Sequence, residues 1–288
     1  MAANRTQETQ HIHKIYADFY RISGGLAFVI LGIWIGSLLF SDGYATNVYT
    51  ELLSVVATIV VLDQINQWRD KQNLKARLMN EVKSPAIGQA TAALVWLRRE
   101  NWIATNSFKN SDLQNVNWAN AYIGELNFES SILRGANLQN VTNEKSNFEK
   151  NNRWQEIIFR RANLRLSNLS GAKLAGTNFR EADLYSADLS KAYLRVANFS
   201  FANLRRAKLH DTVLTNVSLV GANLANAELQ NNKWIFNDGT RPAILPDGEY
   251  WTAETDIEKF TNPDHPDFEA TLEKINTIRA DNNIEAIK

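Results

Sequence analysis

The side chains that most often carry catalysis or bind metals are few and scattered in this chain. It has four histidines, and two of them, His11 and His13, have a spacing that could ligate a metal ion. Both lie in a polar N-terminal stretch, and two histidines alone do not make a closed metal site. The 288 residues include no cysteine, which excludes disulfides, thiolate nucleophiles and cysteine-ligated zinc. We therefore predict no metal-binding residue.

The acidic residues do not suggest a catalytic pair either. Asp183 and Asp188 look like a pair in the sequence, but both occupy the same position of the repeated unit described below. We find no glycine-rich phosphate loop and no spacing of Ser, His and Asp that is typical of a nucleophilic enzyme. We predict no catalytic residue, no cofactor-binding residue and no cofactor, and we do not expect an enzyme.

Arginine is the residue type whose spacing is most informative. The whole chain holds 31 basic and 31 acidic residues, but residues 106–236 hold sixteen and eleven, so their net charge is 16 − 11 = +5. Several arginines recur twenty residues apart or lie beside such positions, namely Arg160, Arg161, Arg165, Arg180, Arg195, Arg205 and Arg206. Two interpretations stay open. These side chains form a charged face that keeps the protein in solution, or a surface that binds an acidic partner protein, lipid headgroups or nucleic acid.

A five-residue repeat positions these arginines. Between about residue 106 and residue 236, Leu or Phe recurs at nearly every fifth position, as at Leu184, Leu189, Leu194 and Phe199. Two places before each of these centres the residue is small, most often Ala. Large and small side chains that alternate inward can fill a narrow interior, and the polar residues after each centre must point outward. Because five residues suit one side of a square coil, four units make a twenty-residue turn.

The repeated units resemble the pentapeptide-repeat family, whose consensus is a small residue, Asp or Asn, Leu or Phe, and two variable outward residues. The resemblance implies a β-solenoid, a right-handed quadrilateral β-helix of about six and a half coils with a rise of about 4.8 Å per coil. Asn before a centre, as at Asn163, favours tight corners through hydrogen bonds to the backbone. The centres follow one register to Phe148 and another from Trp154, offset by one residue, so we expect a bulge or small loop at residues 141–152.

The same resemblance raises one specific function. Some members of the family are quinolone-resistance proteins that mimic DNA and bind gyrase. A DNA mimic must reproduce the charge of the phosphates and therefore needs an anionic rod. The repeats of this chain are mildly cationic, so gyrase binding is the least favoured function.

Two apolar segments precede the repeats. Residues 22–40 contain no charged residue and are long enough to cross a hydrocarbon core of about 30 Å. Residues 48–65 form a second candidate span, with Glu51 and Asp63 near its ends. A cleaved signal peptide stays an alternative for the first segment, and a helix along the membrane surface for the second. The pattern favours an α-helical transmembrane hairpin.

The distribution of basic residues predicts the orientation of this hairpin. The loop between the two segments has no Lys or Arg, whereas a basic neck follows the second segment with Arg69, Lys71, Lys75 and Arg77. We therefore predict a multi-pass membrane protein in contact with the lipid bilayer, with both termini and the repeat domain in the cytoplasm. Gly32 and Gly36 allow close helix packing, either within the hairpin or between protomers, so a homo-oligomer through these helices stays open.

We divide the chain into five parts. These are a cytoplasmic N-terminal tail (1–21), the hairpin (22–65), the neck with a capping helix (66–105), the β-helix (106–236) and a C-terminal cap (237–288). Helices are expected at residues 85–100, 255–260 and 266–280, because the end coils of a solenoid must be covered.

The leading functional prediction is a membrane-anchored, non-enzymatic scaffold that presents a rigid β-helix to an unidentified partner protein. The alternative is an electrostatic binding module for anionic lipid or nucleic acid, of which nucleic acid is the less expected.

Overall fold

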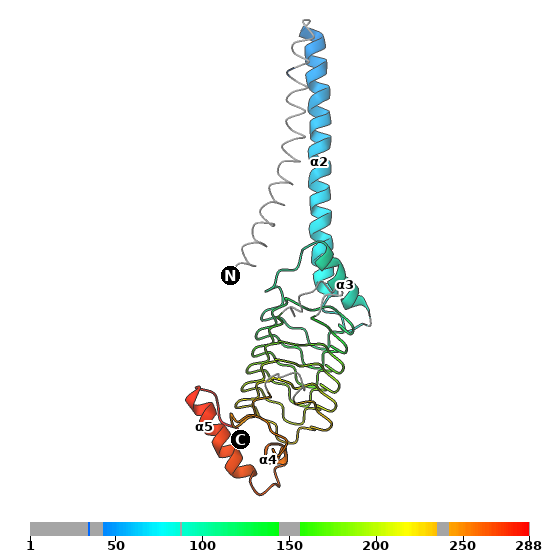
Figure 1. Ribbon diagram of the computed structural model, residues 1–288. Coiled ribbons are helices and arrows are strands. Elements are labelled where there is room, and N and C mark those ends of the chain that lie inside the picture. Colours follow the sequence, from blue (N-terminus) through cyan, green and yellow to red (C-terminus); the bar gives the residue numbers. More distant parts are fainter. Residues whose placement is uncertain (1–33, 35–42, 87, 144–155, 235–241, 288) are drawn as a thin grey trace. The chain divides into compact units, whose positions relative to one another are not determined.

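The structure is a computed structural model of the full chain, and it describes residues 34, 43–86, 88–143, 156–234 and 242–287 (Figure 1). The chain divides into two compact units, Met1–Ala76 and Arg77–Lys288. The described helices are α2 (Gly43–Glu81), α3 (Gln89–Arg99), α4 (Glu258–Thr261) and α5 (Phe268–Asp281). The second unit holds the repeats together with α3, α4 and α5.

The repeats form a stack of four-sided coils, as Figure 1 shows between α3 and α4. Parallel bridges join residues twenty apart, such as Asn163 with Asp183 and Asp183 with Asn203, so each side of a coil spans five residues. Side 1 is centred on Phe108, Phe128, Phe159, Phe179, Phe199 and Leu219, which identifies six coils. Sides 2, 3 and 4 follow at successive five-residue steps, and corners 1, 2, 3 and 4 are the turns after the sides of the same number. In the described repeats each bridge joins single residues, not continuous strands. The stack of four-sided coils confirms the predicted quadrilateral β-helix.

The interior of the coils is filled by the centres and by the small residues two places before them. Leu164, Leu184 and Leu204 on side 2 are fully buried, as are Ala162 and Ala207. The Phe residues of side 1 stack face to face, and the rings of Phe179 and Phe199 lie 4.5 Å apart at an interplanar angle of 5°. Each buried centre stabilises the fold by about 1.5–3 kcal/mol before the cost in entropy.

Each corner is a tight turn with one residue in the left-handed conformation. At corner 1 of the third coil, Ala162 N donates to Phe159 O at 3.0 Å, and Arg161 has φ 57°. A positive φ at the third residue of a four-residue turn is the geometry of a type II turn. Asn163 Oδ1 accepts a hydrogen bond from Arg165 N at 3.2 Å, which confirms the expected role of Asn before a centre.

The register between the second and third coils differs from the prediction. Bridges there join Asn127 with Ile158 and Asn137 with Asn168, a separation of 31 residues in place of twenty. The insertion is therefore 31 − 20 = 11 residues, not one, because two further repeat-length units accompany the one-residue shift. Asn143 is the centre of side 4 of the second coil. The next described side is side 1 of the third coil, which is centred on Phe159. The expected centres Phe148 and Trp154, and most of the expected bulge, lie outside the described residues.

α3 covers the first coil. Arg98 Nη2 donates to Gly124 O at 2.8 Å, and Trp118 Nε1 donates to Val82 O at 2.7 Å. The helix begins four residues later than expected, because Gly88 before it has φ 79° in the left-handed region and interrupts the helical path. Its apolar face packs on the coil through Ala90, Ala93, Leu94 and Leu97.

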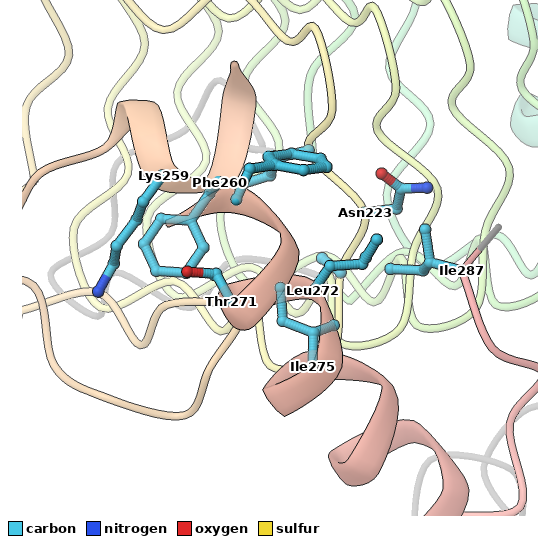
Figure 2. A pocket seen from close by; sticks show the side chains of 10 residues that line it. Asn223, Lys259, Phe260, Thr271, Leu272, Ile275 and Ile287 are labelled. Atoms are coloured by element: carbon cyan, nitrogen blue, oxygen red, sulfur yellow. The ribbon is translucent and has the colours of Figure 1, made fainter. Parts of the chain in front are cut away.

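α4 and α5 cover the last coil, close to the residues where both helices were expected. Asn226 N donates to Thr261 O at 2.6 Å, and Arg279 Nη1 donates to Gly221 O at 2.6 Å. Figure 2 shows the small pocket between these helices and the coil, which is lined by Phe260, Leu272 and Ile275 from the helices and by Asn223 from the coil. Most of its lining is apolar, so the pocket belongs to the packing of the cap.

The prediction of a membrane hairpin is corrected. Among the described residues, we find no helix with the length and apolar character required to span a bilayer. The predicted second span lies within α2, where the uncharged run between Glu51 and Asp63 covers only about 16 Å at 1.5 Å per residue. The hydrocarbon core is about twice as thick. The predicted multi-pass location with a cytoplasmic repeat domain is therefore wrong, while residues 22–40 lie outside the described residues apart from Trp34.

Candidate functional site

Three of the seven predicted arginines converge on one glutamate at corner 1. Glu181 lies one coil above Arg161, whose Nε donates to its carboxylate at 2.6 Å. Arg180 Nε lies 3.0 Å from the same carboxylate, and Arg160 Nη2 lies 3.6 Å from it. Only 12% of the Glu181 side chain is exposed. One carboxylate thus joins arginines from two successive coils.

The electrostatics of corner 1 favour the ionised form of Glu181. Desolvation raises the pKa of its carboxyl group, but the hydrogen bonds and charges of Arg161, Arg180 and Arg160 together outweigh that effect, so the pKa is lowered overall. The hydrogen bond to Glu181 also raises the pKa of Arg161. In the second coil, the hydrogen bond from Lys109 lowers the pKa of Glu129, and these two groups lie 2.8 Å apart. Along corner 1, basic and acidic side chains of successive coils therefore pair with one another.

The C-terminal cap covers part of corner 1. The Arg180 guanidinium lies 4.6 Å from the ring centre of Phe201, which is buried. Arg279 of α5 donates through Nη1 to Gly221 O and to Phe201 O, the latter at 3.4 Å. Burial lowers the pKa of Arg279. The arginines of corner 1 are therefore engaged by Glu181 and by an aromatic ring, and the cap binds the backbone of the same corner, as in a structural cluster.

Corner 2 holds three more of the predicted arginines, in a different environment. Arg165 Nη1 contacts Asp183 at 3.2 Å, and its guanidinium lies 4.3 Å from the ring centre of Tyr185 in the next coil. The Arg206 guanidinium lies 6.0 Å from the same ring. Arg205 follows one coil after Tyr185, since Ser186 N donates to Arg205 O. Within the described residues, neither Arg205 nor Arg206 forms an ion pair with a carboxylate.

The remaining predicted basic residues lie elsewhere. Arg195 belongs to corner 4, so the structure does not bring it together with the arginines of corners 1 and 2. Of the four neck residues, Arg77 forms an ion pair with Glu81 at 2.9 Å. Arg69, Lys71 and Lys75 lie on α2, and no feature of the described residues tests their predicted role.

Two exposed apolar residues at the corners were missed from the sequence. Leu166 at corner 2 is 53% exposed and has φ 59°, and Val196 at corner 4 is 40% exposed and has φ 63°. Bulky or β-branched residues are disfavoured in the left-handed region. The second residue after every centre takes this conformation, so the five-residue register could have identified both positions.

The histidines do not assemble into a metal site among the described residues. His210 Nε2 contacts Glu228 at 2.5 Å, and His265 Nε2 contacts Asp256 at 3.0 Å. In the described part of the chain, no three His, Asp or Glu side chains group closely enough to hold an ion. His11 and His13 lie outside the described residues.

Comparison with known proteins identifies the repeat. The sequence matches the family described as pentapeptide repeats, in eight copies, over residues 107–142, 162–200 and 197–231. A comparison with curated proteins gave no match to this chain.

Several solved structures are similar to this chain. A pentapeptide repeat protein from the thylakoid lumen of Arabidopsis thaliana is 26% identical, over 43% of this chain and 69% of that protein, with a TM-score of 0.27. HetL of the cyanobacterium Nostoc sp. strain PCC 7120, involved in regulating heterocyst differentiation, is 21% identical over 54% and 98%, with a TM-score of 0.22. QnrB1, a plasmid-mediated fluoroquinolone resistance protein, is 14% identical over 50% and 76%, with a TM-score of 0.30. These TM-scores are low, so the assignment depends on the repeat match and the coil geometry.

Proposed function

Because this chain is a pentapeptide-repeat protein with a β-helix of stacked coils, we propose that it is a non-enzymatic scaffold whose outward side chains bind a partner protein. The observation that carries this proposal is the filled interior. In the third to fifth coils the centres and the small residues two places before them are buried to 2% exposure or less. The coil interior thus offers no room for a substrate, and only the outward residues are available for binding.

The distribution of charge argues against a partner that normally binds DNA and would recognise this chain as a mimic of DNA. The outward positions of corners 1 and 2 are rich in arginine, whereas mimicry of DNA requires a rod of negative charge. Electrostatic binding of lipid or nucleic acid, the other candidate, has less support. Glu181 and Asp183 pair with arginines of corners 1 and 2, so less positive charge is left for an extended acidic lipid surface or phosphate backbone.

The test is proximity labelling by the full chain in its native cell. A labelling enzyme is fused to the wild-type chain and, as a matched control, to the variant Leu184→Asp, which places a charge in the fully buried interior. We expect one or a few proteins to be labelled by the wild-type fusion and lost with the control. Labelling of the same proteins to the same extent by both fusions would contradict a scaffold that acts through its folded coils.

A further inference from the structure

Resting on the proposed scaffold function, we propose that corner 2 of the second to fifth coils binds an acidic polypeptide segment of the partner that also carries an apolar side chain. This corner-2 surface consists of Arg134, Arg165, Leu166, Tyr185, Arg205 and Arg206. Corner 1 is excluded from the surface because Glu181 and the ring of Phe201 already engage its arginines.

Backbone hydrogen bonds hold the corner-2 surface in register. Gly135 N donates to Arg165 O at 2.9 Å, Leu166 N donates to Tyr185 O at 3.0 Å, and Ser186 N donates to Arg205 O at 2.9 Å. Arg134, Arg165, Tyr185 and Arg205 therefore form one column with one side chain per coil. With a rise of about 4.8 Å per coil, the column spans about 14 Å, the length of a short peptide segment.

The surface carries a net positive charge that the protein does not neutralise itself. It holds four arginines and one nearby carboxylate, Asp183, which pairs with Arg165 at 3.2 Å, so the local charge is 4 − 1 = +3. In the described part of the chain, Arg134, Arg205 and Arg206 have no ion-pair partner. Such a surface fits a segment rich in Asp and Glu.

Leu166 supplies the second, independent observation. It is more than half exposed and takes a left-handed conformation that Gly or Asn would adopt at lower cost. The equivalent corner position of the preceding coil is Gly135. An exposed leucine that also strains the backbone weakens the fold, so its presence among arginines indicates a contact with a partner.

The mixture of chemistries favours a polypeptide over nucleic acid. Arginine and tyrosine are among the residues that dominate binding energy at protein interfaces. The phosphates of a duplex are strongly hydrated and do not contact leucine favourably.

The experiment measures binding of a fluorescein-labelled twelve-residue peptide of alternating Glu and Leu to the full chain by anisotropy. A second peptide has Ser in place of each Leu, and a DNA duplex is the competing probe. We expect the Glu–Leu peptide to bind most tightly, with an affinity that falls as salt is added. Arg134→Glu combined with Arg205→Glu should weaken binding about tenfold or more.

Two controls separate binding from folding. Lys191→Glu combined with Lys208→Glu makes the same change in charge at exposed positions of corner 3 and side 3 and should leave the affinity unchanged. Leu166→Asn should weaken binding about fivefold while raising the melting temperature, because it removes the apolar contact together with the strain.

The outcomes are distinct. The inference is overturned if the Glu–Leu peptide does not bind at low salt. It is also overturned if Arg134→Glu combined with Arg205→Glu leaves the affinity unchanged, or if the duplex binds more tightly than the peptide. If proximity labelling still identifies partners that depend on the folded coils, the scaffold proposal stands and only the corner-2 surface falls.

Discussion

Arg161 and Glu181 occupy the same corner position in successive coils, and the arginine donates to the carboxylate across 2.6 Å. Each residue has a positive φ, of 57° and 61°. Their contact exists only because twenty residues of chain complete one turn. The pair therefore reports directly on the stacking of the third coil on the fourth.

Replacing Glu181 with Gln should destabilise the coils. The three arginines around it would lose their shared carboxylate and repel one another, so we expect the free energy of unfolding to fall by about 1–2 kcal/mol. Urea denaturation monitored by circular dichroism measures the change. A variant as stable as the wild type would mean that the contact contributes nothing to stability.

The same glutamate predicts sensitivity to acid. Because the folded-state pKa values of Glu181 and Glu129 are lowered from about 4.5, both carboxylates contribute stability above that pH. This contribution is lost as the pH falls through the folded-state values. The difference in stability between the wild type and Glu181→Gln should therefore shrink below about pH 4.5. Denaturation at several pH values tests this, and a constant difference down to pH 2 would count against it.

Tyr122 should titrate late and make the fold sensitive to alkali. Burial raises its pKa to about 12, with a further contribution from Glu125, while Arg98 acts in the opposite direction. Because the unfolded-state value is about 10, the neutral phenol contributes stability below pH 10 that is lost between pH 10 and 12. Tyr122→Phe should lose less stability than the wild type over that interval. Absorbance of tyrosinate against pH should show one late-titrating group missing in the variant.

Val196 should be a site where the fold can be stabilised. Asn216 occupies the same corner position in the next coil, with φ 55° against 63° for the β-branched Val196. Val196→Asn should raise the free energy of unfolding by about 1 kcal/mol, and the matched reverse change Asn216→Val should lower it by a similar amount. Thermal denaturation of both variants measures these changes in stability. If both substitutions stabilised the fold, or both destabilised it, that result would refute the argument from backbone strain.

Removal of residues 144–154 should leave the coils intact. Eleven residues separate the observed spacing of 31 from the regular spacing of twenty, so this deletion joins Asn143 to Gln155 with Phe159 in the normal register. We expect an unchanged far-ultraviolet spectrum and cooperative unfolding. Removal of only residues 144–153 is the control. It leaves a one-residue offset and should cause a clear loss of stability, because an outward residue would then face the interior.

The regular part of the fold could be predicted from the sequence because its signal is local. Leu184 and Leu189 repeat the same environment, and Asn163 forms its hydrogen bond two residues along the chain. The eleven-residue insertion could not be derived in this way. A one-residue phase shift looks the same whether it comes alone or with two further units, and only the bridge from Asn127 to Ile158 distinguishes them.

The stacking of Arg160 with Arg180 follows from their spacing, but the chemistry around them does not. Spacing alone places Arg160 and Arg180 in one column, but it does not show that Glu181 lies among them with little exposure. The apolar run within α2 shows the same limit, since its hydrophobicity suggested a membrane span, but the run between Glu51 and Asp63 is too short to cross a bilayer.

By itself, the sequence determined that this chain winds into square coils, because each buried centre is specified by residues within five positions. The tertiary structure decided which coil stacks on which, and hence which charges meet. Contacts such as that between Arg161 and Glu181 join residues twenty positions apart. Their energies depend on burial and rotamers that exist only once the coils are stacked.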